Sequence, residues 1–184
     1  AAYDYYFDTQ EANGGSDREP VLWTKSGPSV INKNPVLSNG SVTPSVGPLG
    51  KLFSFYVTYA DTDGDTPTVA KVYINGTPYA MSLYSGSPSS GTYRYQTTFS
   101  QPGTYNYYFY FEDGQGGNSR LPGSGTLSLT VFKCGDVNGD GIVGLPDVIY
   151  LVNYIFNKPG GPGPGGTWPI VPLQRADVNG DGII

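Results

Sequence analysis

The sequence predicts a mainly β protein, with a two-layer β-sandwich over residues 1–132 and a small loop-helix module over residues 133–184. Glycine and proline supply 27 and 16 of the 184 residues, and aromatic residues make up 14%, a composition typical of short strands joined by tight turns. Several segments before residue 133 alternate apolar and polar residues with the period of a half-buried strand. After residue 133 the apolar spacing becomes helical.

The middle of the predicted sandwich is the most regular part of the chain. Residues 51–60, KLFSFYVTYA, place four large apolar side chains on one face, namely Phe53, Phe55, Val57 and Tyr59. Five more segments alternate in the same way, at residues 68–75, 78–84, 92–99, 104–111 and 126–132. Their spacing of roughly ten residues suits a β-sandwich. Asn75–Gly76 predicts a tight hairpin, because both residue types tolerate a positive φ.

The first 50 residues are less regular. Residues 3–8 and 21–25 are predicted strands, whereas residues 13–19 and 38–50 are predicted loops. The strand at 3–8 has no close hairpin partner in the sequence, and an unpaired strand is a template for pairing with another chain. The sequence therefore predicts an exchanged N-terminal strand and head-to-tail association of copies of the chain.

The C-terminal module is predicted to contain one helix, at residues 147–157. Its apolar side chains share one face at helical spacing, and they are Val148, Leu151, Val152, Ile155 and Phe156. Pro146 suits the first turn of a helix. Residues 158–167 are rich in Gly and Pro and predict a linker or long loop. The apolar face must be covered by the sandwich, by residues 168–173, by a further C-terminal segment or by a neighbouring molecule.

A repeat supplies the most specific signal. Residues 135–143, GDVNGDGIV, recur as residues 176–184, ADVNGDGII. Such a loop offers Ca²⁺ side-chain oxygens at positions 1, 3 and 5, a carbonyl at position 7 and a carboxylate at position 12. The first copy supplies Asp136, Asn138, Asp140, the Ile142 carbonyl and Asp147. The second copy supplies Asp177, Asn179, Asp181 and the Ile183 carbonyl, and its position 12 would follow residue 184, so this site is predicted to be incomplete.

The first copy resembles half of a type I dockerin, a calcium loop followed by one helix. The matching residues are Asp136, Asn138, Asp140, Gly141, Asp147 and the helix at 148–156, and the resemblance covers residues 134–184. It implies bound Ca²⁺ and a cohesin-like protein partner. Leu145 and Pro146 stand at positions 10 and 11 of the loop, where dockerins often carry small hydroxyl residues, so the recognition positions are altered.

The sandwich resembles the immunoglobulin-like repeats of microbial surface proteins. The resemblance lies in YADTDGDTPTVAKVYINGTPY at residues 59–79 and in GTYNYYFYFEDGQGG at residues 103–117. It implies an Ig-like β-sandwich and an extracellular or cell-surface location.

Three further features are weaker candidates for sites. Asp61, Asp63 and Asp65 lie between two predicted strands and could hold a cation, with Glu112 and Asp113 at the same end of the sandwich; a solvated turn is the alternative. Asn39 and Asn75 fit the glycosylation pattern, although Asn75–Gly76 is also explained by a turn. The Tyr-rich strands could form a sugar-binding platform, an interface between subunits, or one core face and one exposed face.

Composition excludes several functions. The chain has no His and one Cys, Cys134, which removes His-based catalytic arrangements and an intramolecular disulfide. A net charge of −5 argues against nucleic acid, and no apolar run reaches the roughly 18 residues of a membrane helix. We therefore predict a non-enzymatic extracellular calcium-binding structural protein that self-associates into a surface layer or fibre. The alternatives are a dockerin-type adaptor for a cohesin and a non-catalytic carbohydrate-binding module.

Overall fold

The computed structural model describes residues 4–5, 7–10, 12, 14, 16–19, 25–26, 31–170 and 172–178. The chain divides into two units, Ala1–Lys33 and Asn34–Ile184. The first strand of the sandwich therefore begins after residue 33 rather than within the first residues of the chain. Among the described residues, no helix has the length and apolar character needed to cross a membrane.

The N-terminal unit consists of antiparallel strand pairs. Strand β1 (Asp4–Tyr5) pairs with β4 (Lys25–Ser26), and β2 (Phe7–Gln10) pairs with β3 (Ser16–Glu19). The described residues of the predicted strand at 3–8, which are Asp4, Tyr5, Phe7 and Asp8, thus have partners within their own chain, although the sequence suggested none. The loop predicted at 13–19 is shorter, because its second half is β3; Gly14, with φ of 89°, lies between β2 and β3. Residues 21–24 of the other predicted strand lie outside the described residues.

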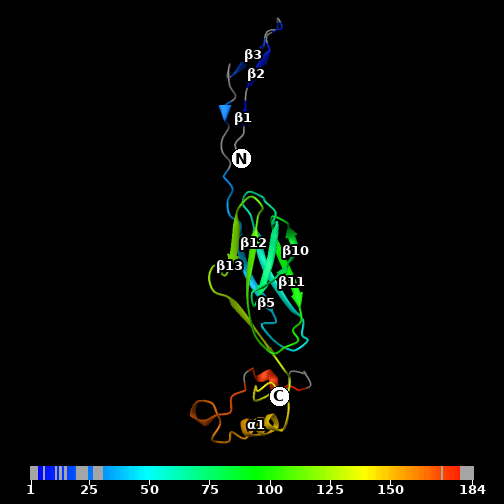
Figure 1. The fold of residues 1–184 in the computed structure, drawn as a ribbon, viewed down its shortest axis with the longest axis vertical. Coiled ribbons are helices and arrows are strands. Elements are labelled where there is room, and N and C mark those ends of the chain that lie inside the picture. Colours follow the sequence, from blue (N-terminus) through cyan, green and yellow to red (C-terminus); the bar gives the residue numbers. More distant parts are fainter. Residues whose placement is uncertain are drawn as a thin grey trace. The chain divides into compact units, whose positions relative to one another are not determined.

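The second unit contains a β-sandwich of two sheets (Figure 1). The first sheet has the order β10-β11-β7-β5 and consists of β5 (Val36–Thr43), β7 (Phe53–Ala60), β10 (Ser82–Ser87) and β11 (Ser90–Thr97). The second sheet has the order β6-β14-β12-β8-β9, and β13 also pairs with β12. Its strands are β6 (Val46–Pro48), β8 (Val69–Ile74), β9 (Thr77–Ala80), β12 (Gly103–Glu112), β13 (Asn118–Leu121) and β14 (Leu127–Phe132).

This strand order is that of an immunoglobulin-like sandwich. Taken as strands A, B, E and D, the series β5-β7-β11-β10 forms the first Ig sheet, and β14-β12-β8 forms the G-F-C core of the second. Strand β6 continues from β5 but joins the opposite sheet, where it pairs in parallel with β14. The predicted mainly β fold with an Ig-like sandwich is therefore confirmed.

Three sequence predictions within the sandwich need correction. The segment at 78–84 is two strands in different sheets, β9 and β10, and the chain crosses between the sheets at the buried Met81. The predicted loop at 38–50 contains most of β5 and all of β6. Its Asn39–Gly40 sequence is a β-bulge rather than a turn, since Asn39 has φ of 53° and the register shifts between Ser38 and Ser41. Strand β13 was not predicted.

Aromatic side chains form the sandwich core. Phe53, Phe55, Val57 and Tyr59 are fully buried, as their alternation predicts. Phe55 of β7 meets Tyr107 of β12 edge to face, with ring centroids 5.1 Å apart, and this pair joins the strands that a disulfide joins in antibody domains. Near the start of β12, the Tyr105 hydroxyl donates a 2.9 Å hydrogen bond to the Gln101 carbonyl, the geometry of an Ig tyrosine corner.

The C-terminal module contains helix α1 (Leu145–Ile155) and two 3-10 turns, η1 (Pro164–Gly166) and η2 (Leu173–Ala176). A proline stands in the first turn of the helix, as predicted, and Gly144 precedes the helix. The helix begins and ends two residues earlier than the predicted bounds of 147–157. The small core consists of Val137, Ile170 and Ala176, with Tyr150 and Leu151 packed against it.

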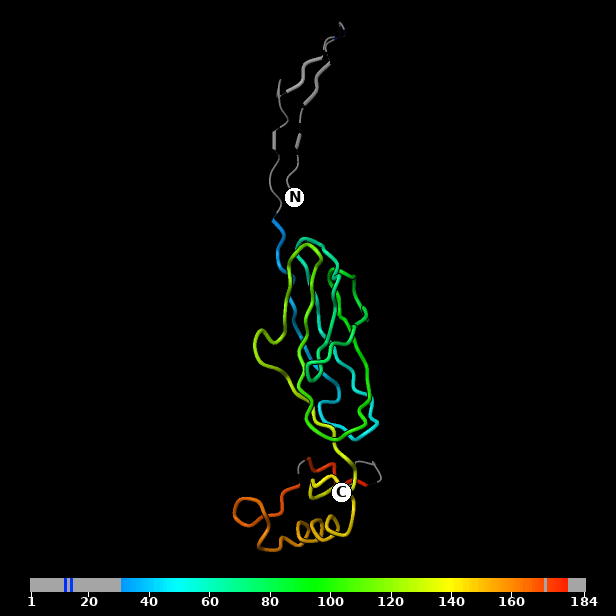
Figure 2. Tube along the Cα trace, in the orientation of Figure 1, coloured from blue at the N-terminus to red at the C-terminus, as the bar shows by residue number. Residues whose placement is uncertain are grey.

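The Gly/Pro segment at 158–167 is more ordered than the sequence suggested (Figure 2). It contains turn η1 and folds back on itself, because the Gly161 N–H donates to the Gly166 carbonyl over 2.7 Å and the Gly163 N–H donates to the Thr167 carbonyl over 2.9 Å. Trp168 closes the segment by donating from Nε1 to the Lys158 carbonyl over 2.9 Å.

Candidate metal centre

The first repeat folds into a tight loop held by its own polar side chains. Asp140 Oδ1 accepts a 2.8 Å hydrogen bond from the Ile142 N–H, and Asn138 Oδ1 accepts one of 3.0 Å from the Asp140 N–H. Gly139 and Gly141 have φ of 81° and 88°, a region that only glycine adopts readily. The sequence folds this way locally because its Asp and Asn side chains satisfy the turn amides and its glycines permit the turn.

Two carboxylates of this loop are buried, Asp136 at 2% exposure and Asp147 at 3%. Asp147 lies in the first turn of α1, where its Oδ2 accepts from the Gly144 N–H over 2.8 Å and its Oδ1 accepts from the Asn138 N–H over 3.1 Å. Asp136 Oδ2 accepts from the Gly141 N–H over 3.2 Å. Positions 1 and 12 of the loop are therefore brought together around its backbone.

One oxygen in this loop lacks a partner. Asp136 Oδ1 is buried and has no hydrogen-bond partner among the described residues, and a buried carboxylate oxygen is costly unless a donor or a metal ion satisfies it. The other groups are carboxylate, amide and carbonyl oxygens, which are the ligands that Ca²⁺ prefers. The residues of the first loop therefore fit a calcium ion.

Charge in the loop is balanced by hydrogen bonds and nearby cations. The Ile142 N–H and the Asn138 side-chain amide lower the pKa of Asp140 below its usual value, with a smaller contribution from the charge of Lys133. Arg175 Nη1 lies 3.3 Å from Asp136 Oδ2. The shift favours the ionised form of Asp140, which is the form that can bind a metal ion.

The second repeat is described only at its start. Asp177, its first predicted ligand, is buried at 8% exposure. Asn179, Asp181 and Ile183 lie outside the described residues, so calcium binding by this loop stays a prediction.

A separate acidic group lies at one end of the sandwich. One carboxylate oxygen from each of Asp61, Asp65 and Asp113 lies within 4.8 Å of the others. Asp61 and Asp65 follow β7, and Asp113 follows β12. Asp63 is not in this group; its backbone N–H donates to Asp61 Oδ1 over 2.8 Å. Burial, together with the charges of Asp61 and Asp113, raises the pKa of Asp65.

Asp113 has the best-defined position of the three. It is buried at 3% exposure, and its Oδ1 accepts hydrogen bonds from the Gln115 N–H over 2.7 Å and from the Gly117 N–H over 2.9 Å. Asp61 Oδ2 is buried and has no hydrogen-bond partner within the described part of the chain. The sequence signal for Asp113 is its place directly after a strand, where the turns of an Ig-like sandwich meet.

Both candidate glycosylation residues are exposed. The Asn39 amide donates to Thr58 Oγ1 over 3.5 Å, whereas Asn75 Oδ1 accepts from the Asn106 N–H over 2.9 Å. Asn75 thus supports a turn, with φ of 47° followed by 82° at Gly76, and modification at either residue stays a prediction.

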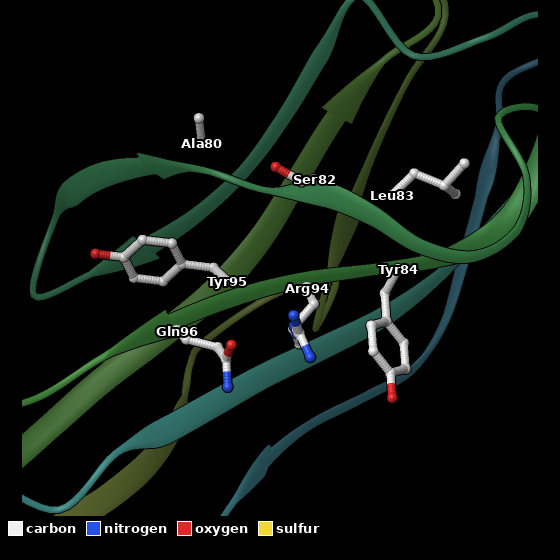
Figure 3. Close-up of a pocket in the computed structure, with 7 residues that line it drawn as sticks. All are labelled: Ala80, Ser82, Leu83, Tyr84, Arg94, Tyr95 and Gln96. Atoms are coloured by element: carbon white, nitrogen blue, oxygen red, sulfur yellow. The ribbon is translucent and has the colours of Figure 1, made fainter.

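The Tyr-rich strands divide between core and surface. Tyr93 and Tyr107 are buried, and Tyr95 and Tyr105 pack against the core. Figure 3 shows a hollow at the β10–β11 edge, where the Arg94 guanidinium carbon lies 4.4 Å from the centre of the Tyr84 ring. In the opposite sheet, Tyr73 stacks on Tyr108 with 4.7 Å between ring centroids. Most of these tyrosine rings therefore pack against the core, against another ring or against an arginine.

Comparisons with known proteins support the C-terminal assignment. The family model of the dockerin type I domain matches residues 134–184, which include both repeats and α1. No curated protein matches the chain.

Solved structures similar to this chain are domains of other proteins. A PKD domain of an M14-like peptidase from a Thermoplasmatales archaeon is 22% identical, with a TM-score of 0.38, covering 56% of this chain and 100% of its own. A CARDB domain from Pyrococcus furiosus, solved with di-metal ions, is 22% identical, with a TM-score of 0.39 and coverage of 57% and 95%. Domains 4 and 5 of the S-layer protein SbsC are 15% identical, with a TM-score of 0.30 and coverage of 63% and 61%.

The candidate residues of the first loop lie within the matched segment. Asp136, Asn138, Asp140 and Asp147 all fall between residues 134 and 184, and each accepts a hydrogen bond from a backbone amide of the same loop. Residues 134–184 therefore match the dockerin type I domain, and in this chain they follow a β-sandwich of immunoglobulin-like topology.

Proposed function

We propose that this protein is a non-enzymatic, extracellular calcium-binding protein whose dockerin module docks onto a cohesin-type partner. Dockerin modules bind calcium and cohesins, and they occur in extracellular or cell-surface proteins; Ig-like domains are typically non-catalytic. The observation that carries the proposal is the exposed apolar surface of α1, directly after the calcium loop.

That surface is extensive. Its exposed apolar residues are Ile142, Val143, Leu145, Val148, Ile149, Val152, Ile155 and Phe156. Fully covering one such side chain is worth about 1.5–3 kcal/mol relative to leaving it in water. A contiguous apolar patch of this kind marks a protein–protein interface more often than a free surface.

The recognition positions favour a partner with an apolar surface. Leu145 is 69% exposed, and Leu145 and Pro146 offer no hydroxyl to a partner. In the second half of the helix, a hollow between α1 and η2 is lined by Leu151, Tyr154, Ile155, Leu173 and Ala176. A cohesin that binds this module would therefore insert apolar side chains rather than hydrogen-bond to Ser or Thr.

Calcium would be held by Asp136, Asn138, Asp140, the Ile142 carbonyl and Asp147. The ion would supply positive charge to carboxylates whose partners without it are backbone amides and Arg175. Because Asp147 belongs to the first turn of α1, a ligand set that includes it fixes the start of the helix relative to the loop. Removing calcium is then expected to loosen the docking surface.

Binding to an immobilised type I cohesin domain tests this function. We expect capture in calcium, loss in excess chelator and loss with Val148→Asp. Ser100→Asp, a change at an exposed sandwich residue, should bind like wild type. If no type I cohesin is captured while the protein takes up calcium normally, the cohesin assignment is wrong.

Self-association into a layer or fibre is the second candidate. The sequence favoured it because the N-terminal strand has no close hairpin partner there. In the structure β1 pairs with β4 and β2 pairs with β3, which removes that support. The exposed face of α1 remains a surface that a second copy could cover. Concentration-dependent sedimentation of the pure protein in calcium, abolished by Val148→Asp, would favour this function over cohesin binding.

A second cation site at Asp61, Asp65 and Asp113 also stays a proposal. Their crowding and the unpartnered Asp61 Oδ2 support it, since a cation would relieve both the repulsion and the missing partner. Asp63 is left out, because its side chain is not in the group that the structure brings together.

A further inference from the structure

The strongest unexplained contact in the module is an ion pair between the first repeat and the turn that precedes the second repeat. Arg175 belongs to η2 and lies two residues before Asp177, the first ligand of the second loop. Its Nη1 is 3.3 Å from Asp136 Oδ2 and donates to the Asp136 carbonyl, also over 3.3 Å. A residue that immediately precedes the second repeat therefore contacts position 1 of the first calcium loop.

This contact is built into the fold rather than lying on its surface. The side chains of Arg175 and Asp136 are 16% and 2% exposed. The Gly135 N–H donates to the Arg175 carbonyl over 2.8 Å, which fixes the backbone beside the loop. A Cβ at Gly139 would lie 2.8 Å from Arg175 Nη1, so the glycine of the loop leaves room for the guanidinium.

We propose that Arg175 is the resident counter-ion of the first loop: it neutralises Asp136 when calcium is absent and competes with calcium for that carboxylate. The inference rests on the proposed calcium function of the loop. A buried carboxylate without a cation is strongly destabilising, which explains why a cation is held there. A guanidinium and a divalent ion on the same carboxylate repel each other, so one weakens the binding of the other.

The two oxygens of Asp136 divide this role. Oδ2 is held by Arg175 and the Gly141 N–H, whereas Oδ1 has no hydrogen-bond partner among the described residues. Oδ1 would therefore be the oxygen of Asp136 that calcium takes without displacing a partner, whereas Oδ2 would be shared between the ion and Arg175. Arg175 is thus a positioning residue that keeps the empty loop folded and lowers its calcium affinity.

Comparison of the two repeats shows that the arginine counter-ion accompanies only the first loop. In the alignment of the two copies, the residue equivalent to Arg175 is Cys134, whose side chain brings no positive charge to Asp177. The counter-ion of the first loop therefore has no equivalent at the same position of the second loop.

Calorimetric calcium titration of wild type, Arg175→Met and Arg175→Lys tests the inference. Removing one nearby positive charge should tighten the first-loop site by about tenfold in Arg175→Met, while Arg175→Lys, which keeps the charge, should stay within about threefold of wild type. In chelator, the α1 circular dichroism signal of Arg175→Met should melt at a lower temperature. Equal or weaker affinity in a variant that is folded in chelator overturns the proposal.

A second measurement does not depend on the folding of the variant. In wild type, the Arg175 Nε–H resonance should shift as the first equivalent of calcium binds, and Asp140→Ala should show no such shift. A resonance that does not move while the first loop fills would refute the competition. If wild type binds no calcium in this loop, the proposed function fails as well; if only the arginine readouts are unchanged, this inference alone fails.

Discussion

Two groups of aspartates in this protein look alike in sequence and differ in the structure. In the first dockerin loop, backbone amides and Arg175 surround the carboxylates, and the pKa of Asp140 is lowered. At the end of the sandwich, Asp61, Asp65 and Asp113 face one another, and the pKa of Asp65 is raised. The residue type is the same, and the neighbouring groups decide the direction in which the pKa shifts.

The difference shows how each group is held. The DVNGDG loop is a local structure whose amides and carboxylates are contributed by a short stretch of chain, so it depends little on the sandwich. The sandwich group is assembled from two turns that β7 and β12 bring to one end. Local loops keep their geometry when distant packing changes, whereas assembled groups depend on it.

Phe111→Ala should have the largest effect on the sandwich group while leaving the first loop unchanged. Phe111 is fully buried and its ring centroid lies 5.6 Å from that of Tyr59; both rings lie just before the acidic turns. We expect a loss of about 3–5 kcal/mol of unfolding free energy, measured by denaturant unfolding of the sandwich. Calcium titration of the first loop should remain as in wild type, and a parallel loss there would show that the two regions are coupled.

Matched glycine substitutions compare the two loops directly. Gly64 and Gly139 both have positive φ, 85° and 81°, but a Cβ at Gly64 meets nothing within 4 Å, whereas one at Gly139 meets Arg175. Gly64→Ala should cost about 1–2 kcal/mol from backbone strain alone. Gly139→Ala should cost more and also change calcium affinity. Equal losses in thermal unfolding would mean that the guanidinium is not packed against the loop.

Acid should affect the two regions in opposite directions in chelator. Asp65 has a raised pKa in the folded state, so its contribution to stability is greatest below the usual value of 3.8 and is lost as pH rises through the folded pKa. Asp140 has a lowered pKa, so its contribution is present above 3.8 and is lost as pH falls through the folded pKa. We expect the melting temperature of the sandwich to vary with pH differently in wild type and in Asp65→Asn. The pH dependence of the loop-helix module should be the same in both proteins.

The sequence predicted what depends on local patterns. The alternation of residues 53–59 predicted β7 and its buried face, and Asn75–Gly76 predicted the β8–β9 turn. It failed where tertiary context decides. Asn39–Gly40 has the composition of a turn but forms a bulge in β5, and Met81 takes the chain from one sheet to the other inside an apparently continuous strand.

The same limit applies to the candidate sites. Spacing alone was enough to propose the first-loop residues as calcium ligands, because the geometry of such a loop is local, and their role as ligands stays a prediction. It could not identify Arg175, which follows the first loop by a helix and a Gly/Pro segment and reaches Asp136 only through tertiary folding. Nor could spacing decide that Asp65 rather than Asp63 joins Asp61, since this depends on which carboxylates face the turn after β12.

Calcium stoichiometry in Asp140→Ala tests the central claim most directly. Calorimetry of wild type, Asp140→Ala and Asp65→Ala, each prepared free of metal, should show that Asp140→Ala lacks one first-loop equivalent present in wild type. Asp65→Ala should retain that equivalent, and the α1 circular dichroism signal should weaken only in Asp140→Ala. An Asp140→Ala isotherm that superimposes on the wild-type isotherm would contradict the assignment of the first loop as a calcium site.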